Sequence, residues 1–230
     1  FEFIGNTDPI QIAVPGLHIT RGTKFFGQVN SNSNKISGSL TSLGIGYKEK
    51  SAEVIDISSQ VINNKLTLEG RINRIQLTDT LWVGQLGFNG DALNNLVNYN
   101  ISWDNKTEHT NKGAFNGTAN FLGTASVDIN LKQAQFSLED STWTADPDAH
   151  FRIDSSQIMV SNFMFRSGKQ GIGVNGIVSK NPVDKIKLRL QKFNLAVLNR
   201  FIGNNLKLNG IVDGDTDFSS VYSDLVYKSD

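Results

Sequence analysis

The stretch LKLNGIVDGDTDF, from Leu206 to Phe218, alternates between two kinds of residue. Its even-numbered positions are mostly apolar residues or glycine, while its odd-numbered positions include lysine, asparagine and three aspartates. Successive side chains leave opposite faces of a β-strand, so a period of two predicts a strand with one buried face and one solvated face. The stretch therefore predicts a strand that is apolar on one side and acidic on the other.

The same alternation elsewhere extends this prediction to an all-β fold. NKLTLEGRIN (Asn64–Asn73) and DKIKLRLQKF (Asp184–Phe193) each place aliphatic residues on one face and charged or polar residues on the other. The segment QIMVSNFMFRS (Gln157–Ser167) carries apolar residues at both parities. That segment is either covered on both sides or contains a β-bulge that changes its phase.

Helix signals are sparse. They are confined to a short segment near residues 194–203, where Asn194 can cap the start and Gly203 can end the helix. We see no linker-like segment, so we expect one elongated β domain over residues 1–230.

Glycine recurs in the middle of the expected strands, flanked two residues away by apolar side chains. Examples are Leu68-Gly70-Ile72, Val174-Gly176-Val178 and Leu208-Gly210-Val212. Because glycine ordinarily weakens a strand, its recurrence indicates sharp local curvature or close approach of another group.

The composition excludes several classes of function. The 230 residues include 22 Lys+Arg and 22 Asp+Glu, so no net basic field attracts nucleic acid. Cysteine is absent, which excludes disulfides, thiolate catalysis and cysteine-ligated zinc. The chain lacks an initiating methionine, a signal peptide and a membrane-length apolar run, so we expect a fragment of a longer protein.

The acidic run matches only part of a calcium loop. Asp213, Asp215 and Asp217 fit the first three acidic positions of an EF-hand, but Phe218 replaces its glycine and Asp224 its final glutamate. We expect a solvated strand face, and weak calcium binding by the three aspartates stays open.

Other candidate chemistry lacks the required context. DPDAH (Asp146–His150) offers oxygen and nitrogen ligands but is typical of an exposed loop. The glycines of Gly171–Gly176 match G-x-G-x-x-G inside a strand pattern, with no helix after them. No nucleophile–base grouping occurs, so we expect no enzyme, no cofactor and no metal site.

Residues 151–218 resemble the TamB family of translocation and assembly proteins, within the wider AsmA-like group. The resemblance rests on the order of VSNFMFRSG (Val160–Gly168), KIKLRLQKFNLAVLNRF (Lys185–Phe201) and LKLNGIVDG (Leu206–Gly214). Upstream, NYNISWDNKTEHTNKGAFNGTANF (Asn98–Phe121) is similar to segments of such proteins from Bacteroidetes-type bacteria.

The resemblance implies a fold and a function. The fold is an elongated antiparallel sheet curled into an open groove, a β-taco, with an apolar concave face. The function is non-enzymatic: phospholipid transport between membranes, or translocation and assembly of outer-membrane proteins with an outer-membrane barrel partner. The full-length protein would be periplasmic and anchored in the inner membrane through a region absent from this fragment.

We expect the groove to be lined by aliphatic residues of the alternating strands. These residues would contact phospholipid acyl chains or unfolded outer-membrane protein strands. The candidates are Leu66, Leu68, Ile72, Ile172, Val174, Ile186, Leu188, Leu190, Leu206, Leu208 and Val212.

The tryptophans keep a second function open. Trp82, Trp103 and Trp143 could stack on sugar rings if they are exposed, or pack inside a β structure. The alternative hypothesis is therefore an extracellular β-sandwich that binds glycans or acts as an adhesin.

Overall fold

The computed structural model describes residues 2–5, 14–78, 81–106, 111–138, 141–200, 207–222 and 226–229. The fold is all-β: 75% of the residues are in strands and 4% in helical turns. The strands pair antiparallel, which confirms the all-β prediction and is consistent with a curled open sheet. The described residues include no helix with the length and hydrophobicity that a membrane span needs.

The chain divides into two compact units, unit 1 (Phe1–Ala114) and unit 2 (Phe115–Asp230). Unit 1 is built from successive hairpins, and a short 3₁₀ turn, η1 (Ser31–Ser33), connects two of its strands. Its strands are β1 (Glu2–Gly5), β2 (Leu17–Ile19), β3 (Thr23–Asn30), β4 (Lys35–Tyr47), β5 (Lys50–Ile62), β6 (Lys65–Gln76), β7 (Trp82–Leu93) and β8 (Leu96–Asp104), and β9 (Asn111–Phe121) runs from unit 1 into unit 2.

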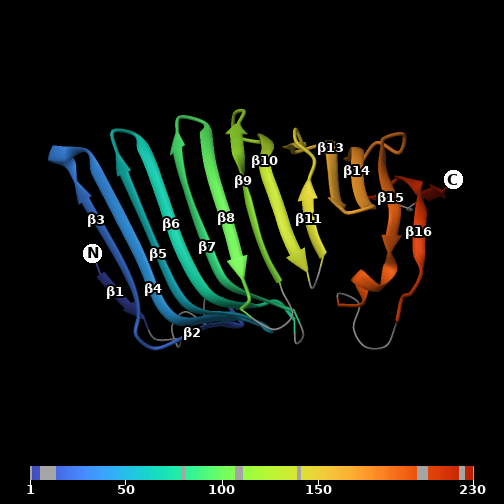
Figure 1. Ribbon diagram of the computed structural model, residues 1–230. Coiled ribbons are helices and arrows are strands. Elements are labelled where there is room, and N and C mark those ends of the chain that lie inside the picture. The colour runs from blue at the N-terminus through green and yellow to red at the C-terminus, as the bar shows by residue number, and fades with distance from the viewer. Residues whose placement is uncertain are drawn as a thin grey trace. The chain divides into compact units, whose positions relative to one another are not determined.

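Long strands β4 to β7 bend together near one end, as Figure 1 shows. The pairing on either side of the bend places Leu43, Val54, Asn73 and Gln85 in one line across the four strands. Val54 and Gln85 have positive φ angles of 49° and 46°, and L-residues rarely adopt this left-handed conformation. The bend is therefore a corner shared by neighbouring strands.

Unit 2 contains the remaining strands and a second 3₁₀ turn, η2 (Leu195–Arg200). Its strands are β10 (Ser126–Leu138), β11 (Ser141–Ala145), β12 (His150–Asp154), β13 (Gln157–Ser167), β14 (Gln170–Ser179), β15 (Lys185–Asn194), β16 (Ile211–Ser219) and β17 (Val226–Ser229). Both β11 and β12 pair with β10 on one side and β13 on the other. They are two pieces of one strand, interrupted by the expected loop at residues 146–149.

Two bulges keep apolar residues on one face of unit 2. In β13 the pairing steps from Val160 to Phe163 around Asn162, whose φ is 55°. In β15 it steps from Leu190 to Phe193 around Lys192, whose φ is 42°. Each extra residue resets the alternation, so the bulge alternative for Gln157–Ser167 is correct.

The structure shortens the strand expected over Leu206–Phe218. β16 begins at Ile211, directly after Gly210, whose φ is 111°. Leu208 lies in the preceding connection, where its backbone N–H donates to Asn199 Oδ1 at 2.7 Å. Asn199 thus binds the Leu208 N–H, which in a strand would bond to a neighbouring strand. The prediction of a strand at residues 207–210 is therefore wrong.

The short helix expected near 194–203 is present as η2, and its described turns are 3₁₀ rather than α-helical. Asn194 caps it, because the Ala196 backbone N–H donates to Asn194 Oδ1 at 3.0 Å. Residues 201–206 lie outside the described part of the chain.

Close approach accounts for two of the mid-strand glycines. A Cβ atom at Gly70 would overlap the ring of Phe88, which lies across it from the neighbouring strand. A Cβ at Gly176 would overlap the Lys185 carbonyl oxygen, and Gly176 also has a φ of 128°. Both glycines make room for a neighbouring group, which is one of the two explanations that the sequence pattern left open.

Candidate functional site

Unit 1 presents a continuous apolar face across β3 to β8. The strand registers bring large apolar side chains from all six strands into neighbouring lines on one side of the sheet. We call this the apolar face of unit 1; it comprises Phe25, Val29, Ile36, Leu40, Ile57, Val61, Leu66, Leu68, Ile72, Phe88, Ala92, Val97 and Ile101.

Much of this face is open to solvent. The exposed fraction of its side chains reaches 71% at Val29 and 51% at Ile36, and is 39% at Leu68. Burial increases toward the shared corner, where Ile55 is 6% exposed and Ser42 is also buried. The face is therefore covered near the bend and uncovered toward the β5–β6 hairpin.

Unit 2 differs because part of its apolar face is already filled. Among the described residues, Ile55 is the one buried hydrophobic side chain of unit 1. The other buried hydrophobic side chains belong to unit 2: Ala134, Trp143, Ala149, Val160, Met164, Phe165 and Phe193. Of these, Met164 lies on the charged face, beside Gly173 and Arg189.

An aromatic cluster forms the core on the apolar face of unit 2, and its buried members are Ala134, Trp143, Phe165 and Phe193. The ring centroids of Trp143 lie 6.2 Å from Phe136 and 5.8 Å from Phe193, and Phe136 lies 5.2 Å from Phe165. Leu195, Val197 and Leu198 of η2 pack against the same cluster. These rings and the 3₁₀ turn fill one end of the apolar face with the chain's own side chains.

The predicted groove residues fall into two sets. Leu66, Leu68 and Ile72 lie on the apolar face of unit 1, on β6. The second set lies in unit 2, where the registers place Ile172, Val174, Ile186, Leu188, Leu190 and Val212 on one face of β14, β15 and β16. Ile172 and Leu190 pack on the aromatic cluster.

Two predicted groove residues are not on these strands. Leu208 is half-buried in the connection before β16, and Leu206 lies outside the described residues. Conversely, Phe25, Val29 and Ile36 belong to the apolar face of unit 1 and were not among the candidates. The pattern apolar-x-Gly-x-apolar, present at Phe25-Gly27-Val29 and Ile36-Gly38-Leu40, was the signal that marked them.

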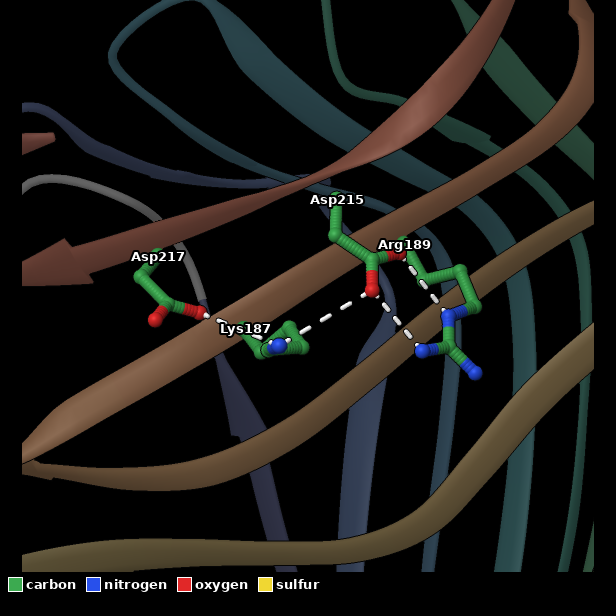
Figure 2. Close-up of polar contacts among 4 residues, drawn as sticks. All are labelled: Lys187, Arg189, Asp215 and Asp217. Carbon is green, nitrogen blue, oxygen red and sulfur yellow. Dashed lines mark hydrogen bonds and ion pairs between the residues drawn. The ribbon is translucent and has the colours of Figure 1, made fainter. Parts of the chain in front are cut away.

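The acidic run lies on the charged face of unit 2, opposite the face that carries Ile172, Leu188 and Val212. Arg189 donates two hydrogen bonds of 2.8 Å to the Asp215 carboxylate, and Lys187 Nζ lies 3.8 Å from Asp215 and 3.7 Å from Asp217 (Figure 2). Hydrogen bonds from Arg189 hold the pKa of Asp215 below its usual range. Two of the three aspartates are therefore paired with cations of the neighbouring strand.

The carboxylate of Asp146 and the imidazole of His150, in the segment interpreted as an exposed loop, also have protein partners. Arg166 donates to both carboxylate oxygens of Asp146 at 2.9 and 3.0 Å. His150 Nε2 lies 3.5 Å from Asp128, whose pKa is lowered by the hydrogen bonds from Arg152. Within the described ranges, no three histidine or carboxylate side chains gather as metal ligands.

The three tryptophans do not form a common platform. Trp143 is 1% exposed in the unit 2 core. Trp103 donates its indole N–H to Asn111 Oδ1 at 2.9 Å, and the Arg74 guanidinium lies 4.6 Å from the Trp82 ring centre. Trp143 thus has no face to offer a sugar ring.

No protein-family model matches the chain, and comparisons with curated proteins and with solved structures also give no match.

Proposed function

We propose that this chain is a groove-forming segment of a periplasmic bridge protein of the TamB type, and that its apolar sheet face holds phospholipid acyl chains. The role is non-enzymatic, and the segment would be anchored to the inner membrane through another region of the full-length protein. The observation that carries the proposal is the exposed apolar face of unit 1, which spans six strands.

An exposed face of this extent favours a guest. Soluble proteins rarely leave large continuous apolar surfaces in water, and such surfaces mark binding grooves or interfaces. Each methylene moved from water onto an apolar surface contributes about 0.8 kcal/mol when fully buried. With strands about 4.8 Å apart, β3 to β8 span about 24 Å, comparable with an extended acyl chain.

The uniformity of the face favours movement of the guest along it. Its large side chains are aliphatic or aromatic, with glycines and Ser59 between them, and no charged residue interrupts the lines between β3 and β8. A chain lying across these strands meets similar contacts at each step, so no position holds it much more strongly than the next.

The alternative of a β-sandwich that stacks glycans on its tryptophans receives less support. The described strands of each unit form one sheet rather than the two packed sheets of a sandwich. Trp143, one of the stacking candidates, is buried.

Site-specific photocrosslinking in cells tests the proposal. A photoreactive phenylalanine analogue is placed at Leu68 of the full-length protein, and the matched control carries it at Thr67, the adjacent residue on the opposite face. We expect lipid adducts, identified by mass spectrometry, at position 68 and few at position 67.

The identity of the adduct separates the two cargoes considered for this fold. Crosslinks from position 68 to outer-membrane proteins, without lipid, would show that the face serves unfolded strands instead. Equal labelling at both positions, or no adduct at either, would remove the support for a guest-binding groove.

A further inference from the structure

The polar face of unit 1, opposite the apolar face, contains two connected depressions. Their volumes are about 610 and 480 Å³, and Ser58, Glu69 and Asn89 line both. The shared residues make the two depressions one trough along β5 to β8.

One line of hydrogen-bonding side chains crosses the middle of this trough. The registers place Ser58, Glu69, Asn89 and Asn100 next to one another on four successive strands. Ser58 Oγ donates to Glu69 Oε1 at 3.2 Å, and Asn100 Nδ2 donates to Asn89 Oδ1 at 3.1 Å. An amide has two donor hydrogens and an acceptor oxygen, so these bonds leave donors and acceptors for a ligand.

A second line runs beside the first. It consists of Gln60, Thr67, Asp91 and Asn98, and Asn98 Nδ2 donates to Asp91 Oδ2 at 3.2 Å. Lys65 Nζ lies 3.4 Å from the same carboxylate. The cross-strand bonds orient these planar groups before any ligand arrives, which lowers the entropic cost of binding.

An aromatic ring lies at one side of the trough. Phe26 pairs with Ser39 on the polar face and lines the larger depression, and 43% of its surface is exposed. It is a large apolar side chain among serine, asparagine and threonine. An exposed ring beside a field of hydrogen-bonding groups that are mostly amides and hydroxyls suits a ligand with both an apolar face and many hydroxyl groups.

We propose that this trough binds a neutral oligosaccharide. Sugar hydroxyls both donate and accept, as do the amide and hydroxyl side chains of the two lines. The apolar C–H face of a sugar ring would pack on Phe26. The trough carries three carboxylates, Glu69, Asp91 and Asp56, against the two cations Lys65 and Arg71, which disfavours phosphate-rich ligands. This site is independent of the proposed acyl-chain groove, because it lies on the other face of the sheet.

Calorimetric titration and saturation-transfer NMR of the 230-residue chain test the proposal. The probes are neutral oligosaccharides of glucose, mannose, galactose and N-acetylglucosamine. We expect binding by at least one of them, weakened about tenfold in an Asn89→Ala/Asn100→Ala variant, which removes two hydrogen-bonding side chains. Phe26→Ala should weaken binding while leaving the hydrogen-bonding lines in place.

Two controls make the result specific. Asn130→Ala removes an exposed strand asparagine in unit 2 and should leave saccharide affinity unchanged. Val29→Glu, on the apolar face and away from the residues that line the trough, should reduce acyl binding but not saccharide binding. Absence of binding by every probe at millimolar concentration overturns the proposal. Saccharide binding that stays unchanged in the Asn89→Ala/Asn100→Ala and Phe26→Ala variants also overturns it. So does a site at which only acidic polymers compete with the bound probe.

Discussion

Lengthening a fatty acid by four methylenes should strengthen its binding to unit 1 by about 15-fold, because the apolar face covers one side of the guest. The value of about 15-fold follows from a single sheet whose apolar residues remain up to 71% exposed. An acyl chain on such a face keeps its other side in water.

Full enclosure of one methylene contributes about 0.8 kcal/mol, so coverage of one side contributes about 0.4 kcal/mol. At 25 °C this corresponds to about twofold in affinity per methylene. Four methylenes then give about 15-fold, whereas a closed tunnel would give about 200-fold. The length dependence therefore distinguishes an open groove from an enclosed cavity.

Displacement of a fluorescent fatty acid by lauric, myristic and palmitic acid measures this dependence. Leu68→Glu places a charge on the apolar face and should weaken all three acids, while Thr67→Glu on the opposite face should have little effect. Equal affinity for the three acids would refute the groove, since a chain that lies on an apolar surface must gain with each added methylene.

Three further predictions concern stability. Trp143→Ala should destabilise unit 2 by about 3–5 kcal/mol in urea unfolding followed by circular dichroism, while Trp82→Ala should cost less because Trp82 is half-buried. Hydrogen bonds from Arg189 lower the pKa of Asp215, so this pair stabilises the folded state at pH values above the pKa of the unfolded chain. The stabilisation is lost as the pH falls through the pKa of the folded state. Asp215→Asn should therefore flatten the acid limb of a curve of unfolding free energy against pH. Lys192→Gly should be neutral or stabilise by up to about 1 kcal/mol, and Lys192→Val should destabilise, because φ is 42° there; equal unfolding midpoints for the two variants would contradict this.

Alternation predicted the strands well where a hairpin partner continued the pattern. Leu66, Leu68 and Ile72 fall on one face of β6, and Lys187 and Arg189 fall on the charged face of β15, as their spacing indicated. Such assignments succeed because a period of two depends only on local backbone geometry.

The prediction failed where non-local contacts decide the backbone. Leu208 alternates like a strand residue, but Asn199 binds its backbone and Gly210 turns the chain before β16. The bulge at Lys192 has no sequence signal, because the left-handed residue is a lysine. The burial of Trp143 depends on Phe193, which is far along the chain and which the bulge turns toward it.

The corner shared by β4, β5, β6 and β7 restricts how this protein can change during evolution. Leu43, Val54, Asn73 and Gln85 stand in one line. Deleting a residue on one side of the corner in one strand would shift the bend of that strand. The bend would then lie beside straight backbone in the neighbouring strand. A whole hairpin carries its own pair of corners and can be duplicated or lost without that mismatch. Homologous chains should therefore differ in the number of hairpins more readily than in the distance from hairpin tip to corner.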